Sequence, residues 1–263
     1  MPDKVDVGGC RLFAETHGQA GRPWLVLSNC LAADHTMWEP QLEWLASRYQ
    51  VLVYDARGHG ASDVPQGPLE LADLVDDIVA LMDHYDIETA AFLGLSIGGM
   101  TGLGLALTYP ERLSRIVCCC ARSDAPPPFA RGWEDRIARI ATGGIASLLP
   151  ETLDRWVSPE FRSAHPEEFA KLSAMFLRTS DAGYVACATA LQKLAYRPHL
   201  GRIALPALFV AGENDAAAPA EAMRDMAGAV QGARFAIVPG ARHLANVDRP
   251  AAFRDAIAGF LQV

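Results

Sequence analysis

Short apolar runs recur along the chain and predict buried strands. The run WLVLS at 24–28 lies between Pro23 and Asn29, residue types that commonly bound a strand. Comparable runs occur at 51–55, 90–95, 113–119, 207–211 and 234–238. Two further segments near the start, 4–8 and 11–16, flank Gly8-Gly9 and predict a pair of shorter strands.

Helices are predicted between these strands. Residues 69–85 carry apolar side chains three or four positions apart, among them Leu71, Leu74 and Ile78, as one buried helix face requires. Further helices are predicted at 38–48, 97–109, 219–230 and 250–262. Strands that alternate with helices predict an α/β fold, in which helices flank a mostly parallel, twisted sheet. Functional residues of such a fold are expected at the carboxyl ends of the strands.

Residues 122–199 depart from this alternation. The segment begins near Pro126-Pro127-Pro128 and lacks strand-like runs. Helices are predicted within it at 133–148, 151–157, 166–178 and 181–195. We therefore expect a core domain of residues 1–121 and 200–263, into which residues 122–199 are inserted as a helical cap, or lid. The segment holds 10 Lys or Arg and 9 Asp or Glu, against 13 and 22 elsewhere, so the excess negative charge belongs to the core.

Composition narrows the expected partners and location. The formal net charge of −8 over 263 residues argues against a nucleic-acid partner. The six cysteines form no CxxC pair, so reduced thiols are expected rather than a disulfide or metal framework. Residues 89–109 lack charge over 21 positions, but their five glycines favour a buried strand and helix over a membrane span. Since the first ten residues contain no apolar signal region, a cytoplasmic protein with no membrane partner is expected.

One motif carries a specific chemistry. The sequence Gly94-Leu95-Ser96-Ile97-Gly98 matches G-x-S-x-G and joins a predicted strand to a predicted helix, which is the context of a nucleophile elbow. Glycines at both ends allow a sharp turn and a close approach of neighbouring backbone. The motif therefore predicts that Ser96 is a nucleophile.

A serine nucleophile needs a base within hydrogen-bond reach and a carboxylate that orients the base. With such an elbow, the carboxylate and the histidine follow the serine along the chain in that order. Asp215 follows the predicted strand at 207–211, and His243 follows the last predicted strand. We expect Ser96, Asp215 and His243 to be catalytic, with Glu213 as the alternative to Asp215.

An oxyanion hole requires two backbone N–H groups. Ile97, the residue after the nucleophile, is expected to supply one of them. The other is expected from the loop after strand 24–28, where Leu31 is favoured and Cys30 is the alternative, one residue away.

The runs LSNCLAADHTMWEPQ, YDARGHGASDVP, GLSIGGMTG, AGENDAAAP and PGARHLANVDRP together resemble the α/β-hydrolase superfamily over nearly the whole chain. The dipeptides Ser28-Asn29 and Met37-Trp38 are most similar to the 3-oxoadipate enol-lactonase-like subgroup. The resemblance implies hydrolysis of an enol-lactone to a keto acid in aromatic catabolism, with Ser96 as nucleophile, His243 as base and Asp215 as its orienter. One departure is SNCLA where the subgroup has a sequence closer to SNSLG, so that Ala32 replaces a glycine.

The predicted function is therefore that of a serine hydrolase that cleaves a small lactone or ester without a metal or an organic cofactor. The alternatives are a carboxylesterase, a hydrolase of C–C bonds, and a ligand-sensing protein that retains the triad. Monomer and homo-oligomer both stay open. Candidate substrate-binding residues are apolar groups of the cap, a cysteine beside the expected oxyanion hole, and arginines that could bind a substrate carboxylate. They are Cys30, Arg122, Trp133, Trp156, Tyr184 and Arg197, with Arg178 as a further candidate.

Overall fold

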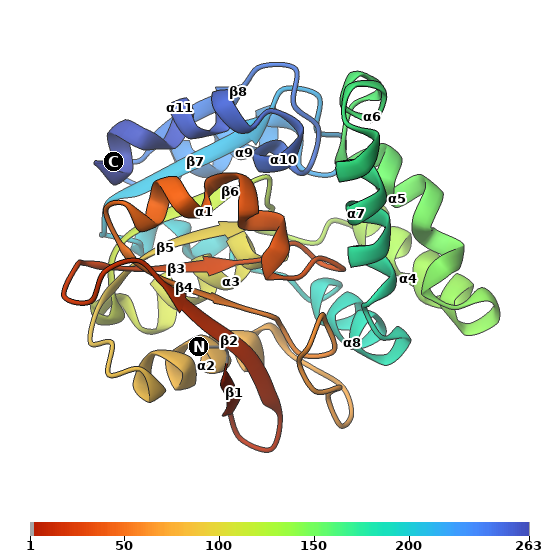
Figure 1. The fold of residues 1–263 in the computed structure, drawn as a ribbon, viewed down its shortest axis with the longest axis horizontal. Helices are drawn as coiled ribbons and strands as arrows, with labels where there is room; N and C mark the ends of the chain where they lie inside the picture. Colours follow the sequence, from red (N-terminus) through yellow and green to blue (C-terminus); the bar gives the residue numbers. More distant parts are fainter. Residues whose placement is uncertain (1–2, 263) are drawn as a thin grey trace.

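Eight strands form one sheet through the middle of the molecule, with helices on both sides (Figure 1). The computed structural model describes residues 3–262. The strands are β1 (Asp3–Asp6), β2 (Arg11–His17), β3 (Trp24–Ser28), β4 (Gln50–Tyr54), β5 (Ala90–Leu95), β6 (Leu113–Cys119), β7 (Ala207–Gly212) and β8 (Arg234–Val238). Their order is β1-β2-β4-β3-β5-β6-β7-β8; β1 and β2 pair antiparallel, and the other six strands run parallel. The predicted α/β fold with a mostly parallel sheet is confirmed.

Helices connect the parallel strands and cover the sheet. Outside the segment 122–199 they are α1 (Glu39–Ala46), α2 (Leu71–His84), α3 (Ile97–Thr108), α9 (Ala220–Gly228), α10 (Ala245–Asp248) and α11 (Pro250–Leu261). Short 3₁₀ helices are η1 (His35–Trp38), η2 (Pro110–Arg112) and η4 (Arg197–Arg202). The helix predicted at 38–48 is shorter than expected, because Trp38 is the last residue of η1 and α1 ends at Ala46.

The centre of the sheet is apolar on both faces. Every residue of β5 is buried, as are most residues of α3, which packs against β5 and β6. The uncharged stretch 89–109 thus forms an interior strand and helix, as predicted. Within residues 3–262, no helix has both the length and the apolar character needed to cross a membrane.

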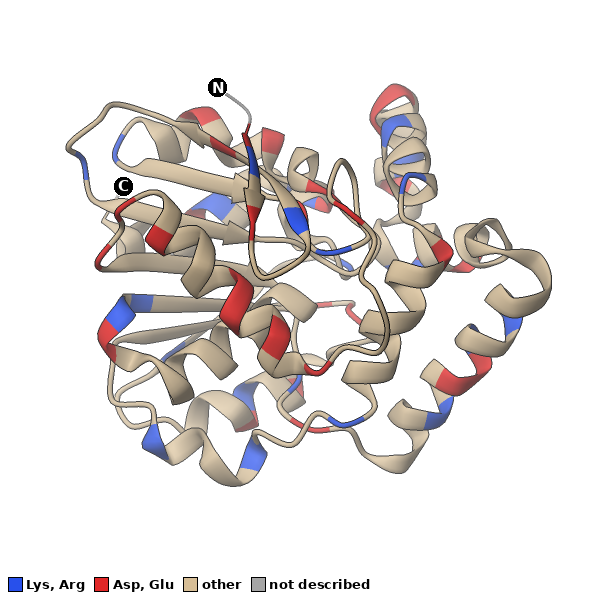
Figure 2. Cartoon of the chain, turned by 90° about the horizontal axis from the view of Figure 1, so that it is seen from below, with Lys and Arg blue, Asp and Glu red and all other residues tan. Residues whose placement is uncertain are grey.

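The segment 122–199 is helical and lies beside the carboxyl ends of the parallel strands (Figure 1). Its helices are α4 (Pro127–Gly143), η3 (Ile145–Leu148), α5 (Leu149–Trp156), α6 (Pro159–Ala164), α7 (Pro166–Leu177) and α8 (Asp181–Leu191). Lys and Arg are interspersed with Asp and Glu over the surface of the molecule, and α4 carries both signs (Figure 2).

The helices of this segment differ from the prediction at four points. Helix α4 begins at Pro127 and not at 133, because prolines lack an N–H and are tolerated in a first helical turn, where that group has no partner. The helix predicted to reach 148 ends at Gly143, since Gly144 has a φ of 64°. Helix α6 was not predicted, and α8 ends at Leu191 rather than near 195.

Candidate active site

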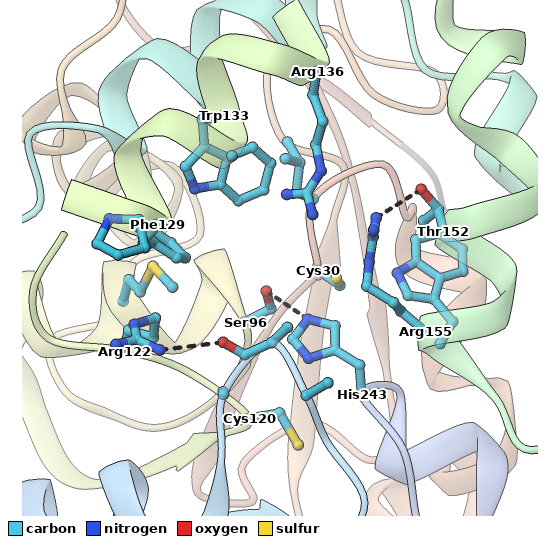
Figure 3. A pocket seen from close by; sticks show the side chains of 18 of the residues that line it. Cys30, Ser96, Cys120, Arg122, Phe129, Trp133, Arg136, Thr152, Arg155 and His243 are labelled. Carbon is cyan, nitrogen blue, oxygen red and sulfur yellow. Dashed lines mark hydrogen bonds between the residues drawn. The ribbon is translucent and has the colours of Figure 1, made fainter. Parts of the chain in front are cut away.

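Ser96 occupies a strained turn between β5 and α3. Its φ of 60° lies in the left-handed region, which non-glycine residues seldom adopt. The flanking glycines are required by space: a Cβ at Gly98 would lie 2.3 Å from the carbonyl oxygen of Ser28, and one at Gly94 would lie 2.2 Å from that of Gly98. The turn brings the Ser96 side chain to the carboxyl end of the sheet, facing a cavity (Figure 3).

Ser96, His243 and Asp215 form a continuous chain of hydrogen bonds. The Ser96 Oγ lies 3.0 Å from the His243 Nε2, and the His243 Nδ1 lies 2.8 Å from the Asp215 Oδ2. The other oxygen of Asp215 accepts hydrogen bonds from the N–H groups of Ala217 and Ala218, which fix the carboxylate in the loop after β7. With Nδ1–H donating to Asp215, the Nε2 lone pair faces the serine hydroxyl.

Glu213 lies elsewhere. Its carboxylate is at the surface and accepts a hydrogen bond from the N–H of Gly240 at 2.7 Å. Of the two acidic residues considered from the sequence, the structure therefore brings Asp215, and not Glu213, to the imidazole of His243.

Burial and Asp215 act in opposite directions on the pKa of His243. Burial is the largest single influence and lowers the pKa, because it disfavours the charged imidazolium. The negative charge of Asp215, its hydrogen bond to the ring and, after these, the neighbouring Cys30 raise the pKa, and together they outweigh burial. The net result is a pKa above the ordinary value for histidine.

The two predicted oxyanion donors are the N–H groups of Leu31, which lines the cavity with Ser96, and of Ile97, which follows Ser96 in the chain. Among residues 3–262, neither the N–H of Leu31 nor that of Ile97 donates to another group of the chain. The N–H of Cys30, the alternative donor, instead contacts the Met37 Sδ at 3.3 Å. These contacts favour Leu31 over Cys30.

The loop that carries Leu31 is held by the Ser28-Asn29 dipeptide. The Asn29 side chain donates to the carbonyl of Tyr54 at 2.6 Å and accepts from the indole N–H of Trp38 at 2.9 Å. The Ser28 hydroxyl shares a 2.6 Å hydrogen bond with the Tyr54 hydroxyl. Buried polar side chains thus join β3, β4 and η1 directly below the loop.

The cavity over Ser96 has a volume of about 510 Å³ and lies between the strand ends and helices α4, α5 and α8. Five of the six predicted substrate-binding residues line it: Cys30, Arg122, Trp133, Trp156 and Tyr184. Arg197 does not; it belongs to η4 and lines a separate surface depression with Ser123 and Asp225. Arg178 also points elsewhere, because its guanidinium binds the carboxylate of Asp34.

Two arginines of the cavity were not predicted. Arg136 descends from α4 and Arg155 enters from α5, so that both guanidinium groups face the space above Ser96 and His243 (Figure 3). The pKa of Arg136 is lowered, mainly by burial and secondly by the positive charge of Arg155. Arg136 also lies 4.5 Å from the ring of Trp133, measured to the ring centroid. The spacing of three between Trp133 and Arg136 placed them on one helix face and could have identified Arg136.

Asp34, His35 and Asp55 offer atoms within 4.8 Å of one another, a spacing compatible with a metal ion. Their atoms already have protein partners. Asp34 binds Arg178 and Thr36, and the His35 Nδ1 lies 2.8 Å from the Asp55 Oδ1. The cluster therefore acts as an ion-pair network that holds the loop after β3.

Comparisons with known proteins agree with this geometry. A 3-oxoadipate enol-lactonase from Acinetobacter baylyi is 34% identical over 94% of this chain and 91% of its own length. The crystal structure of the enol-lactonase from Burkholderia xenovorans LB400 is similar over the full length of both chains, with 34% identity and a TM-score of 0.94. A thermophilic esterase from Thermogutta terrifontis has 28% identity and a TM-score of 0.91, over 100% of this chain and 98% of its own.

The predicted resemblance to enol-lactonases is confirmed by these matches. The sequence model of the α/β hydrolase fold matches residues 23–250, a span that includes Ser96, Asp215 and His243. The chain belongs to the α/β-hydrolase fold family.

Proposed function

We propose that this α/β hydrolase opens a small enol-lactone through an acyl-enzyme formed on Ser96, with His243 as base and Asp215 as its orienter. The observation that carries the proposal is the hydrogen-bonded chain from Ser96 to Asp215 at the floor of the cavity. The names of the two enol-lactonase relatives support the choice of substrate.

In the proposed reaction, the Ser96 Oγ attacks the lactone carbonyl while His243 Nε2 takes the hydroxyl proton. The N–H groups of Leu31 and Ile97 bind the resulting oxyanion. The ring C–O bond then breaks, and His243 returns the proton to the departing enol oxygen. Water attacks the acyl-enzyme, giving its proton to His243; collapse releases the carboxylic acid and restores the Ser96 hydroxyl.

A carboxylate on the substrate would complement the cavity. Arg136 and Arg155 both face it, and their like charges repel each other at close range, so a bound anion would relieve that repulsion. Glu151 lies 3.3 Å from Arg155 and 3.9 Å from Arg136, but it also pairs with Arg139, so this one carboxylate is shared by three cations. Phe129, Trp133 and Trp156 supply the apolar walls.

Residues 122–199 are proposed to act as a cap domain over a core of residues 1–121 and 200–263. Helices α4, α5 and α8 form the roof of the cavity, so they would exclude bulk water from the acyl-enzyme. A cytoplasmic location is proposed because all six cysteines are free and buried, as reducing conditions would maintain them.

The test is turnover of three substrates by wild type and by Ser96→Ala: an anionic enol-lactone, a saturated lactone of equal size, and p-nitrophenyl acetate. We expect the enol-lactone to have the highest kcat/KM, and the variant to lose roughly 10³-fold or more in kcat. Hydrolysis of the simple ester alone would favour a carboxylesterase. If nothing turned over and a fluorophosphonate failed to label Ser96, a ligand-sensing role would replace the proposed enzyme.

A further inference from the structure

The backbone around His243 is held unusually closely. Three consecutive N–H groups are each bound: Arg242 N–H to the Asp248 Oδ2 at 2.8 Å, His243 N–H to the carbonyl of Arg155 at 3.2 Å, and Leu244 N–H to that of Trp156 at 2.9 Å. Two of the three acceptors are the last carbonyls of helix α5. The segment that carries the proposed base is thus bound to the segment 122–199 as well as to its own strand.

Asp248 supplies the third acceptor and has no exposed side-chain surface. Its Oδ1 accepts from the N–H of Ser158 at 3.0 Å, from the Ser158 hydroxyl at 2.6 Å and from the Arg249 Nη1 at 3.0 Å. With Arg242 N–H on the Oδ2, four donors converge on one buried carboxylate. Ser158 lies between α5 and α6, so Asp248 connects the histidine loop to that part of the chain.

Asp248 lies outside the set of residues that line the cavity, and therefore it would not touch a substrate there. The residues bound to Asp248 indicate a structural effect on His243. Ser158 and the end of α5 fix one side, and Arg242, directly before His243, is fixed on the other. Any shift of the carboxylate would move the backbone of His243 relative to Ser96.

We propose that Asp248 is a positioning residue: it sets the distance between the His243 Nε2 and the Ser96 Oγ and makes that distance depend on the docking of α5 and α6. The inference rests on the proposed roles of Ser96 and His243. A displacement of about 1 Å at a catalytic group can cost roughly 100-fold in rate, so a 3.0 Å contact is sensitive to its support.

Asp248→Asn tests the proposal. The variant keeps the shape of the side chain but turns an NH₂ group toward donors, which leaves buried groups unpaired. We expect kcat for p-nitrophenyl acetate to fall about 10- to 100-fold, with KM within about 2-fold of wild type. The pH at which kcat/KM rises should not change, because the hydrogen bond between His243 and Asp215 is retained.

A matched pair of serines provides the control. Ser158 and Ser180 each accept a hydrogen bond from an N–H in the first turn of a helix of this segment, and each hydroxyl donates to the core: Ser158 to Asp248, Ser180 to the carbonyl of Gly58. Both alanine variants should lower stability by about 1 kcal/mol, the usual cost of losing such a cap. We expect Ser158→Ala alone to lower kcat, by roughly 2- to 10-fold, and Ser180→Ala to keep it.

Equal kcat values for Ser158→Ala and Ser180→Ala would overturn the proposal. If Asp248→Asn fails to fold, the comparison of these two serine variants tests the proposal by itself. A rise in KM with unchanged kcat would also overturn it, because Asp248 would then act on binding. The rate at which a fluorophosphonate labels Ser96 gives a second readout of the same alignment. If the wild type were labelled but hydrolysed no lactone or ester, the result would count against the proposed function. In that case, slower labelling of Ser158→Ala than of Ser180→Ala would still support the positioning role of Asp248.

Discussion

At the scale of single residues, the first prediction concerns Asp215 and pH. In the proposed mechanism His243 must be neutral to accept the Ser96 proton, and Asp215 is the main influence that raises the pKa of His243 above its ordinary value. Wild-type kcat/KM should therefore rise with pH through an inflection above about 6.5, the ordinary histidine pKa. Asp215→Asn removes the largest influence that raises the pKa of His243 and leaves the burial that lowers it. The inflection should therefore move to lower pH, with kcat reduced by about 10³- to 10⁴-fold.

Glu213→Gln is the matched control for this measurement, because it removes a carboxylate two residues away that binds Gly240 and not His243. Its pH profile of kcat/KM should coincide with that of wild type. Profiles with the same inflection for wild type and Asp215→Asn would show that another group sets the pKa of the base.

Ala32 has a backbone conformation that its residue type does not predict. The position has a φ of 64°, where a glycine would be unstrained, and alanine there costs about 1 kcal/mol or more. The backbone keeps the left-handed turn because Ala33 N–H binds the carbonyl of Cys30 and Cys30 N–H contacts Met37. Ala32 therefore holds a backbone conformation that favours glycine, and one of the contacts that support it comes from Met37, outside the SNCLA motif.

At the scale of helices and strands, the prediction concerns Arg136, the arginine of α4 that lines the cavity. Arg136→Met should raise KM for an anionic enol-lactone by roughly 10- to 100-fold, the cost of a lost hydrogen bond to a charged group. It should leave KM for neutral p-nitrophenyl acetate within about 2-fold of wild type, because that ester has no carboxylate. The measurement is steady-state kinetics with both substrates.

Arg197→Met is the control, since it removes a surface guanidinium of η4 that faces a different depression. An Arg136→Met enzyme whose KM for the anionic lactone matched that of Arg197→Met would contradict the proposed carboxylate site. The proposed serine mechanism would remain, with a neutral substrate in place of the anionic one.

Some helices, strands and site residues could be predicted from the sequence and others could not. Strands β5 and β6 were predicted to the residue, because all of β5 and the last four residues of β6 are buried, uncharged runs, as a strand covered on both faces requires. The elbow was predictable since its signal is local. Helices α6 and α10, with six and four residues, are too short to show a period. Arg136 and Arg155 read as ordinary helix-surface charges, and their place over Ser96 follows from how α4 and α5 pack.

At the scale of the whole molecule, many contacts attach the helical segment to the core, and three of them are made by the side chains of Arg178, Ser158 and Ser180. Arg178 binds Asp34 near the proposed oxyanion hole, and Ser158 binds Asp248 near His243. Ser180 binds the carbonyl of Gly58 in the loop after β4. Two of the three attachments reach loops that carry proposed catalytic groups. The helices that enclose the cavity are therefore coupled to the geometry of the groups below it, whereas the attachment at Gly58 stabilises the molecule without reaching the site.

The last prediction separates stability from activity at Arg57, the residue directly before Gly58. Arg57 forms two hydrogen bonds with the buried carboxylate of Asp77 in α2, and one with the carbonyl of Val7. Arg57→Met would leave Asp77 buried without its partner, so the free energy of unfolding should fall by about 3–5 kcal/mol. Since Arg57 contacts neither Ser96 nor the cavity, kcat of the folded enzyme should stay within about 2-fold of wild type.

Urea unfolding and kinetics well below the midpoint measure the two effects separately. Because a loss of this size is a large part of typical protein stability, Arg57→Lys provides a milder variant that should still fold. Adding Asp77→Asn to Arg57→Met should restore part of the lost stability, since the stranded charge is then removed. A fall in kcat that the second substitution did not reverse would show that the loop after β4 contributes to catalysis, and that the attachment at Gly58 reaches the site after all.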